Sequence, residues 1–360
     1  MAFDPIQEDC LRLILQSMRR EGIFPLDDAS FIEHGMEQFR TDPSKLITCD
    51  ADRSFHLMAK ATEILDYRLP FLTDEVQVDR QEMQAENYLR EAVDLDASNW
   101  DARRMLAALD SPTNDAYVSY LLDNREAVER DLLATVDAAN DAYSREYASD
   151  LARRPLLRWF AATASRAVIA GQYRLALQTV EESLAFAPAD PAGIRHTGML
   201  ALAKLEASHQ DIKQYRARHA ISYGTAGPLR RRHHMTEKSL DAWTLLAELS
   251  VFYRSFDYTS ADRTLHQLMR AYPNAAEPLL YQAEFPDGLF CRVNVVPGSQ
   301  DELILAISEA TPLLQEGLGT PDNACFAAWI ANHRFIKSAL EDHAPRTPGR
   351  AGLTGSGGDN

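Results

Sequence analysis

The chain has 360 residues, of which 46% are hydrophobic and 25% charged, and its formal net charge at pH 7 is −16. These values are ordinary for a folded protein with a large buried core, built as two domains or as one elongated array. The negative charge argues against a general nucleic-acid binder, and no stretch approaches the ~20 apolar residues of a membrane-spanning helix.

The first predicted helix begins near the N-terminus. Asp4 is expected to cap it, Pro5 suits its first turn, and Gly22 fits just past its end. Glu8 is assigned to the positive end of the helix dipole. One apolar face is predicted from Ile6, Cys10, Leu13, Ile14 and Met18.

Further amphipathic helices are predicted along the rest of the N-terminal half. The helical periodicity covers residues 31–39, 55–67 and 73–95. Residues 113–150 form one long charged helix or two. We expect residues 1–150 to be an acidic N-terminal helical region with one partial repeat.

The second half is predicted to consist of helix pairs. They cover residues 154–188, 190–221 and 239–272, within a repeat core of 151–285. A C-terminal helical pair is expected over 286–342, where Ser299 and Glu302 form a capping box and Asp322 opens the last helix. Only residues 285–299 could be extended, and 343–360 have the composition of a disordered tail.

Two segments align when Ala176 is placed on Ala261. In the first, Gly171 and Tyr173 precede the alanine and Pro188 follows it; in the second, Tyr258 and Pro273 take the corresponding roles. The pattern describes a helical hairpin, in which a tight turn joins two antiparallel helices and small residues let their backbones approach. One such hairpin cannot bury its apolar face alone, so neighbouring hairpins must stack on it.

This pattern resembles the tetratricopeptide repeat, a helix–turn–helix unit of about 34 residues. The match is good over residues 158–191, weaker over 242–275 and partial over 82–99. Residues 192–221 keep a small residue at the helix crossing, Gly198, but their second half is degenerate. The resemblance implies an all-α fold, a tetratricopeptide-like α-solenoid with irregular N-terminal helices.

Proteins of this family mostly bind a peptide or a partner helix in a concave groove lined by the first helices. The positions that the family uses carry the groove candidates Arg158, Ser165, Arg195, Met199, Trp243, Tyr253 and Arg254. A second interpretation stays open for four of them. Met199 and Trp243 can instead be buried between helices, and Arg158 and Arg195 can be solvated or paired within the chain.

Charge is distributed unevenly along the chain. Residues 151–240 carry 14 basic and 6 acidic side chains, net +8, whereas residues 1–150 carry 15 and 32, net −17. The densest basic cluster is Arg230, Arg231 and Arg232, in a segment whose Gly and Pro content is typical of a linker. It is either a solvated linker or a contact for nucleic acid or another polyanion.

No catalytic or metal-binding motif was found, and the sequence predicts no enzyme activity, no cofactor and no metal site. The four cysteines are widely spaced and are expected to be buried thiols in a reducing cytoplasm. The leading hypothesis is a cytoplasmic, non-catalytic protein-interaction scaffold. The alternatives are a regulator that binds nucleic acid or another polyanion through the basic 151–240 region, and a subunit of a larger machine.

Overall fold

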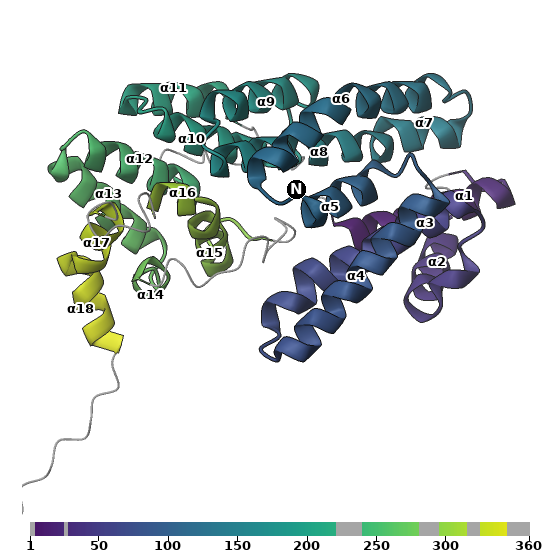
Figure 1. The fold of residues 1–360 in the computed structure, drawn as a ribbon, viewed down its shortest axis with the longest axis horizontal. Helices are drawn as coiled ribbons and strands as arrows, with labels where there is room; N and C mark the ends of the chain where they lie inside the picture. The colour runs from purple at the N-terminus through teal and green to yellow at the C-terminus, as the bar shows by residue number, and fades with distance from the viewer. Residues whose placement is uncertain (1–3, 25–27, 221–239, 281–294, 315–324, 344–360) are drawn as a thin grey trace, which may run out of the picture.

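The computed structural model describes five stretches of the chain: residues 4–24, 28–220, 240–280, 295–314 and 325–343 (Figure 1). Within them the backbone forms α-helices and short helical turns, and no β-strand, so the all-α prediction is confirmed for the described residues. None of the described helices has the length and apolar character that crossing a membrane would require. Arg230–Arg232, Cys291 and Asp322 lie outside these stretches, as do most of 285–299 and residues 344–360.

The described residues of the N-terminal half contain seven α-helices: α1 (Pro5–Glu21), α2 (Ala29–Thr41), α3 (Asp50–Thr62), α4 (Glu75–Leu95), α5 (Trp100–Asp110), α6 (Asn114–Asp137) and α7 (Ala142–Ser149). Helical turns lie between them at Pro43–Lys45, Glu63–Arg68, Leu69–Phe71 and Leu151–Arg153. The predicted cap is confirmed, since the Asp4 carboxylate accepts a hydrogen bond of 2.9 Å from the Ile6 amide. Residues 113–150 form two helices rather than one, α6 and α7.

The predicted apolar face of α1 is partly wrong. Leu13, Ile14 and Met18 are buried, but Ile6 and Cys10 are only half-buried, and Glu8 and Asp9 are buried in their place. The helix is rotated because its carboxylates meet basic partners on α1, α3 and α8. Glu8 lies in the first turn of α1, as predicted, and its carboxylate also forms ion pairs that the sequence did not indicate.

The described residues of the second half contain eleven helices: α8 (Arg154–Ile169), α9 (Tyr173–Phe186), α10 (Ile194–Lys204), α11 (His209–Arg218), α12 (Ala242–Arg254), α13 (Tyr258–Ala271), α14 (Ala276–Leu280), α15 (Gln300–Glu309), α16 (Thr311–Leu314), α17 (Cys325–Asn332) and α18 (Arg334–His343). The first six pair as hairpins, α8 with α9, α10 with α11 and α12 with α13. Ser299 caps α15 by accepting from the Glu302 amide at 3.2 Å. Glu302 does not complete the predicted capping box, because its carboxylate accepts from the amides of Gly298 and Ala242.

The three hairpins share one turn geometry. The second residue after each first helix is left-handed, with φ of 76° at Gly171, 60° at Glu206 and 61° at Phe256. The following amide then bonds back to a carbonyl inside the helix, as in a Schellman motif. These bonds are Gln172 N to Ala167 O at 2.7 Å, Ala207 N to Leu202 O at 3.1 Å and Asp257 N to Phe252 O at 3.0 Å.

The second helices also correspond. α9 and α13 both have 14 residues, and the aligned Ala176 and Ala261 are fully buried in them. The turn that follows each is closed by the same backbone bond, from Asp190 N to Ala187 O and from Ala275 N to Tyr272 O. The helix bounds therefore agree with the register of the sequence alignment.

Residues 192–221 are less degenerate than their sequence suggests. They form the hairpin α10–α11 with the shared turn, capped by a capping box between Ser208 and Asp211. Gly198 stands at the tightest crossing, where a Cβ atom would lie 2.1 Å from the Tyr215 hydroxyl oxygen on α11 and 2.8 Å from Val180 on α9. The small residue predicted here is therefore required by packing.

Phe256 is an unusual residue for this turn. It takes the place of Gly171 with a left-handed backbone, and its side chain is 77% exposed. That conformation costs a non-glycine residue roughly 1–2 kcal/mol.

We expect Phe256→Gly to raise the free energy of unfolding by about 1 kcal/mol. Glycine removes the strain of the left-handed backbone, but part of this gain is lost because glycine also makes the unfolded chain more flexible. Urea denaturation measures it, with Glu206→Gly as the parallel variant; a loss of stability in both would contradict the strain.

The first helices form one layer, because α10 contacts both α8 and α12 (Figure 1). Helices α15 and α16 lie against this layer, in contact with α12, and α16 also reaches α10. At the other end, α5 and α6 contact α8, and α1 joins α3 and α7. The largest hydrophobic core runs from Trp100 on α5 to Ile336 on α18, and it crosses the predicted boundaries at 150 and 286.

Candidate functional site

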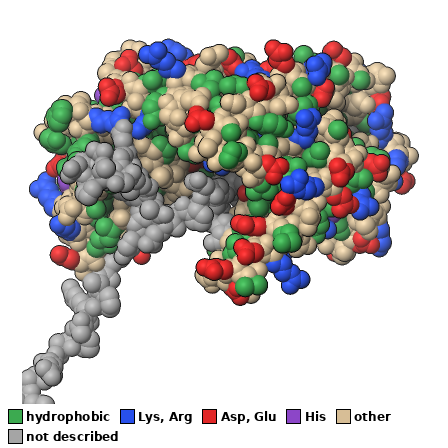
Figure 2. All heavy atoms as spheres, viewed as in Figure 1, with side chains coloured by type: hydrophobic (Ala, Val, Ile, Leu, Met, Phe, Trp, Pro, Cys, Tyr) green, Lys and Arg blue, Asp and Glu red, His purple; other side chains and the backbone are tan. Residues whose placement is uncertain are grey.

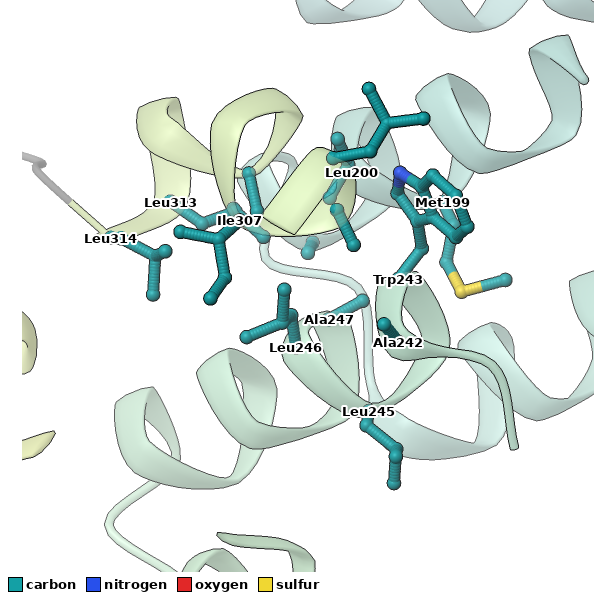
Figure 3. Close-up of a cluster of buried hydrophobic side chains, with 14 of the residues drawn as sticks. Met199, Leu200, Ala242, Trp243, Leu245, Leu246, Ala247, Ile307, Leu313 and Leu314 are labelled. Atoms are coloured by element: carbon teal, nitrogen blue, oxygen red, sulfur yellow. The ribbon is translucent and has the colours of Figure 1, made fainter. Parts of the chain in front are cut away.

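The groove predicted along the first helices is filled by the chain itself at α10 and α12. Met199 and Trp243 are 3% and 5% exposed. They lie in a cluster with Leu200 and Leu246, and Ile307, Leu313 and Leu314 from α15 and α16 approach from the other side (Figure 3). In this structure neither Met199 nor Trp243 is accessible to a partner, as in the second interpretation given to them above.

Polar contacts fix α15 and α16 in this place. The indole Nε1 of Trp243 donates to the Glu309 carboxylate at 2.7 Å, and the Lys204 ammonium donates to the carbonyl of Pro312 at 3.2 Å. The Trp243 ring also stacks on His196, with 4.2 Å between the ring centroids. Helices α15 and α16 therefore occupy the position that a groove-bound peptide was expected to take.

Three further groove candidates are half-buried and engaged. Arg195 donates to the Asp190 carboxylate at 3.0 Å, and Arg254 donates to the Ala203 carbonyl at 3.1 Å. The Tyr253 ring packs on two aromatic rings of α17, those of Phe326 and Trp329. Ser165 on α8 is the one groove candidate among the described residues whose side chain is classed as exposed.

Arg158 lies in a buried ion-pair cluster that joins α1, α5 and α8. Its Nε donates to Asp101 at 2.7 Å and its Nη1 to Glu8 at 2.6 Å, and its side chain is 11% exposed. Glu8 also pairs with Arg12 at 2.7 Å, and Asp101 with Arg104 at 3.6 Å. The cluster holds the N-terminal helices on the hairpins, so Arg158 does not face a groove.

Burial and charge act in opposite directions on these carboxylates. Burial alone would raise the pKa of Glu8 and of Asp101, but the Arg158 charge and its hydrogen bonds outweigh burial and lower both. Asp9 differs, because burial raises its pKa and its hydrogen bond with His56 does not compensate. Asp9 is therefore the buried carboxylate of α1 without a sufficient positive partner.

A cavity of about 230 Å³ lies beside this cluster. Side chains of α1, α3, α5 and α6 line it, together with the turn before α5 and the segment from Tyr147 to Leu156. Its aromatic side chains are Phe55, Trp100 and Tyr147. The indole Nε1 of Trp100 donates to Asp131 at 2.8 Å, which fixes one wall. The cavity is assembled from the N-terminal helices together with the start of the first hairpin, at Pro155 and Leu156 of α8.

The lowered pKa values of Glu8 and Asp101 predict acid sensitivity. A carboxylate with a lowered folded-state pKa stabilises the fold above its unfolded-state pKa, and this contribution is lost as the pH falls through the folded value. We expect the free energy of unfolding to decline as the pH drops below 4.5, the ordinary value for glutamate. Urea midpoints from pH 7 to 3 measure this decline. A flat profile would contradict the ion pairs.

Glu8, Asp9 and Asp101 are interior residues that were not predicted to be buried. The sequence does place charged residues together on one face of each helix. Glu8 and Arg12 are four residues apart, and so are Arg154 and Arg158. Nothing in the sequence indicated that these two pairs meet across 150 residues. The contact between Arg158 and Glu8 depends on how α1 docks, which helical periodicity does not specify.

The cavity lining includes the thiol of Cys49. Within the described stretches, no group of three His, Cys, Asp or Glu side chains could hold a metal ion. The prediction of buried thiols is wrong for Cys49 and Cys325, which are exposed, and Cys10 is half-buried. Both exposed thiols stand at helix starts, where an N-terminal position leaves them on the surface.

No protein-family model, curated protein or solved structure matches the chain.

Proposed function

We propose that the chain is a non-catalytic protein-interaction scaffold built from tetratricopeptide-like hairpins. The observation that carries the proposal is the turn shared by the three hairpins, with Gly171, Glu206 and Phe256 in one backbone conformation. Together with the equal lengths of α9 and α13, it supports a repeated unit. Arrays of such units present extended surfaces to other proteins.

The self-filled groove refines this proposal. Peptides bind such arrays along the first helices, and here α15 and α16 cover that layer at α10 and α12. A protein partner then has two routes: it displaces α15 and α16, or it binds where the layer is open. Ser165 on α8 marks the open part.

The polyanion alternative finds no specific support in the described residues. Several basic side chains of the 151–240 region are paired inside the chain, among them Arg154 with Glu8, Arg195 with Asp190 and Arg216 with Glu248. Figure 2 shows acidic and basic side chains interspersed over the visible face of the described residues. An alternation of both signs does not make the continuous basic surface that phosphates require.

The test begins with co-purification of the full chain from its native cell, followed by mass spectrometry. Each recovered protein is then measured against two variants that place an arginine at an exposed neutral position, Ser165→Arg on α8 and Gln178→Arg on α9. The proposal predicts that Ser165→Arg weakens binding about tenfold or more and that Gln178→Arg does not. Equal binding by both variants, or turnover of a metabolite panel by the purified chain, would contradict it.

A further inference from the structure

The cavity carries negative charge that its own lining does not neutralise. Its wall contains one arginine, Arg12, and five aspartates, a net charge of −4; the aspartates are Asp9, Asp52, Asp96, Asp101 and Asp131. Asp101 is compensated by Arg158, and Arg12 is bonded to Glu8. Asp131 has Arg130 at 3.8 Å, so the remaining excess rests on Asp9, Asp52 and Asp96, which come from α1, α3 and the turn before α5.

Asp9 shows that a donor is missing. Its side chain is 1% exposed, and Oδ2 lies 2.7 Å from Nδ1 of His56. Its other oxygen, Oδ1, is buried and has no hydrogen-bond partner among the described residues. Nearly all buried polar atoms in native proteins have such a partner, and an unsatisfied charged one is costly. A cationic donor entering the cavity supplies the absent bond.

The aromatic side chains of the cavity already contact guanidinium groups of this chain. The Arg12 guanidinium carbon lies 4.0 Å from the centroid of the Phe55 ring and 5.1 Å from that of Tyr147, and the Arg103 guanidinium carbon lies 4.1 Å from that of Trp100. Aromatic faces and carboxylates together favour guanidinium over ammonium, because guanidinium is planar, weakly hydrated and able to form two parallel hydrogen bonds. A volume of about 230 Å³ is below the ~300–1,000 Å³ of sites for drug-sized ligands and suits a single side chain.

We propose that this cavity accepts an arginine side chain of a protein partner. The guanidinium would donate to Oδ1 of Asp9 in the interior and to Asp52 and Asp131 nearer the surface. The inference rests on the scaffold function and specifies the class of partner, a protein segment that presents an arginine. It places recognition at the junction of the N-terminal helices and the hairpins, away from the face that α15 and α16 cover.

The probe is N-acetyl-arginine N-methylamide, which carries the side chain with uncharged ends. Ligand-observed NMR titration against the purified full chain is compared with the citrulline counterpart, which has nearly the same shape and no charge. We expect saturable binding of the arginine compound, weakening with added salt, and at least tenfold weaker binding of the citrulline compound. Equal binding of both compounds, or no binding of either, would overturn the proposal.

Matched variants locate the binding. Asp9→Asn removes the interior carboxylate, and Asp52→Asn removes one nearer the surface in case the first variant does not fold. Asp94→Asn on α4 makes the same change at an exposed aspartate outside the cavity. We expect about a fivefold loss or more for each cavity variant and none for Asp94→Asn.

The two proposals can fail separately. If no variant weakens binding of the arginine compound, the site is refuted, even when a protein partner co-purifies. If the compound binds as expected while no protein partner co-purifies with the full chain, the site stands and the scaffold function fails.

Discussion

Arg158→Ala is expected to lower the free energy of unfolding by about 3–5 kcal/mol, because it leaves the buried carboxylates of Glu8 and Asp101 without their main positive partner. Both carboxylates are almost inaccessible, with side chains 0% and 2% exposed. The same substitution at a residue lining an open groove would change stability by less than about 0.5 kcal/mol. Urea denaturation at pH 7 measures the difference directly.

Arg153→Ala is the matched control for Arg158→Ala. Arg153 lies in the preceding helical turn and is exposed. A second variant tests the physical cause: combining Arg158→Met with Glu8→Gln and Asp101→Asn removes the three central charges. We expect it to recover only part of the stability, because Arg12, Arg104 and Arg154 lose their carboxylate partners. A loss below about 1 kcal/mol in Arg158→Ala would show that the cluster is solvated.

Trp243→Ala is expected to cost about 3–5 kcal/mol as well, here because it opens a cavity between α12 and the C-terminal helices. The indole is buried, stacks on His196 and bonds to Glu309. Trp243→Phe keeps most of the volume and removes the indole donor, so its expected loss is smaller, about 1–2 kcal/mol.

Thermal and urea unfolding of Trp243→Ala should be compared with Ser165→Ala, the exposed candidate on α8. Ser165→Ala is expected to change stability by less than about 0.5 kcal/mol. A similarly small change for Trp243→Ala would mean that α15 and α16 leave this face easily. Trp243 would then be better explained as a residue that lines an accessible groove.

Local features of the hairpins could be predicted from the sequence because they depend on neighbouring residues. The cap at Asp4, the turn after Gly171 and the burial of Ala176 and Ala261 follow from capping chemistry and from small residues at helix crossings. The tetratricopeptide resemblance stays an interpretation, supported by the repeated turn. The turn at Phe256 could not be predicted, because a phenylalanine rarely adopts the left-handed backbone conformation that it has there.

What could not be predicted depends on docking between distant segments. Met199 and Trp243 fit the pattern of groove residues, but both are buried, and Trp243 bonds to Glu309 on α15, 66 residues later in the chain. Arg158 meets Glu8 across 150 residues. Amphipathic periodicity predicts which face of a helix is apolar, but it does not predict which segment of the chain covers that face. For the same reason, the five cavity aspartates come from five separate places in the chain: α1, α3, the turn before α5, α5 and α6.

Hydrogen–deuterium exchange of the full chain tests most directly whether its own α15 and α16 close the first-helix face. We predict slow exchange in α15 and in the parts of α10 and α12 that α15 and α16 cover. Leu313→Asp places a charge in the buried contact of α16, and we expect it to make exchange faster in α10, α12 and α15. Fast exchange of α15 in the unmodified chain, or no response of α10 and α12 to Leu313→Asp, would contradict the account.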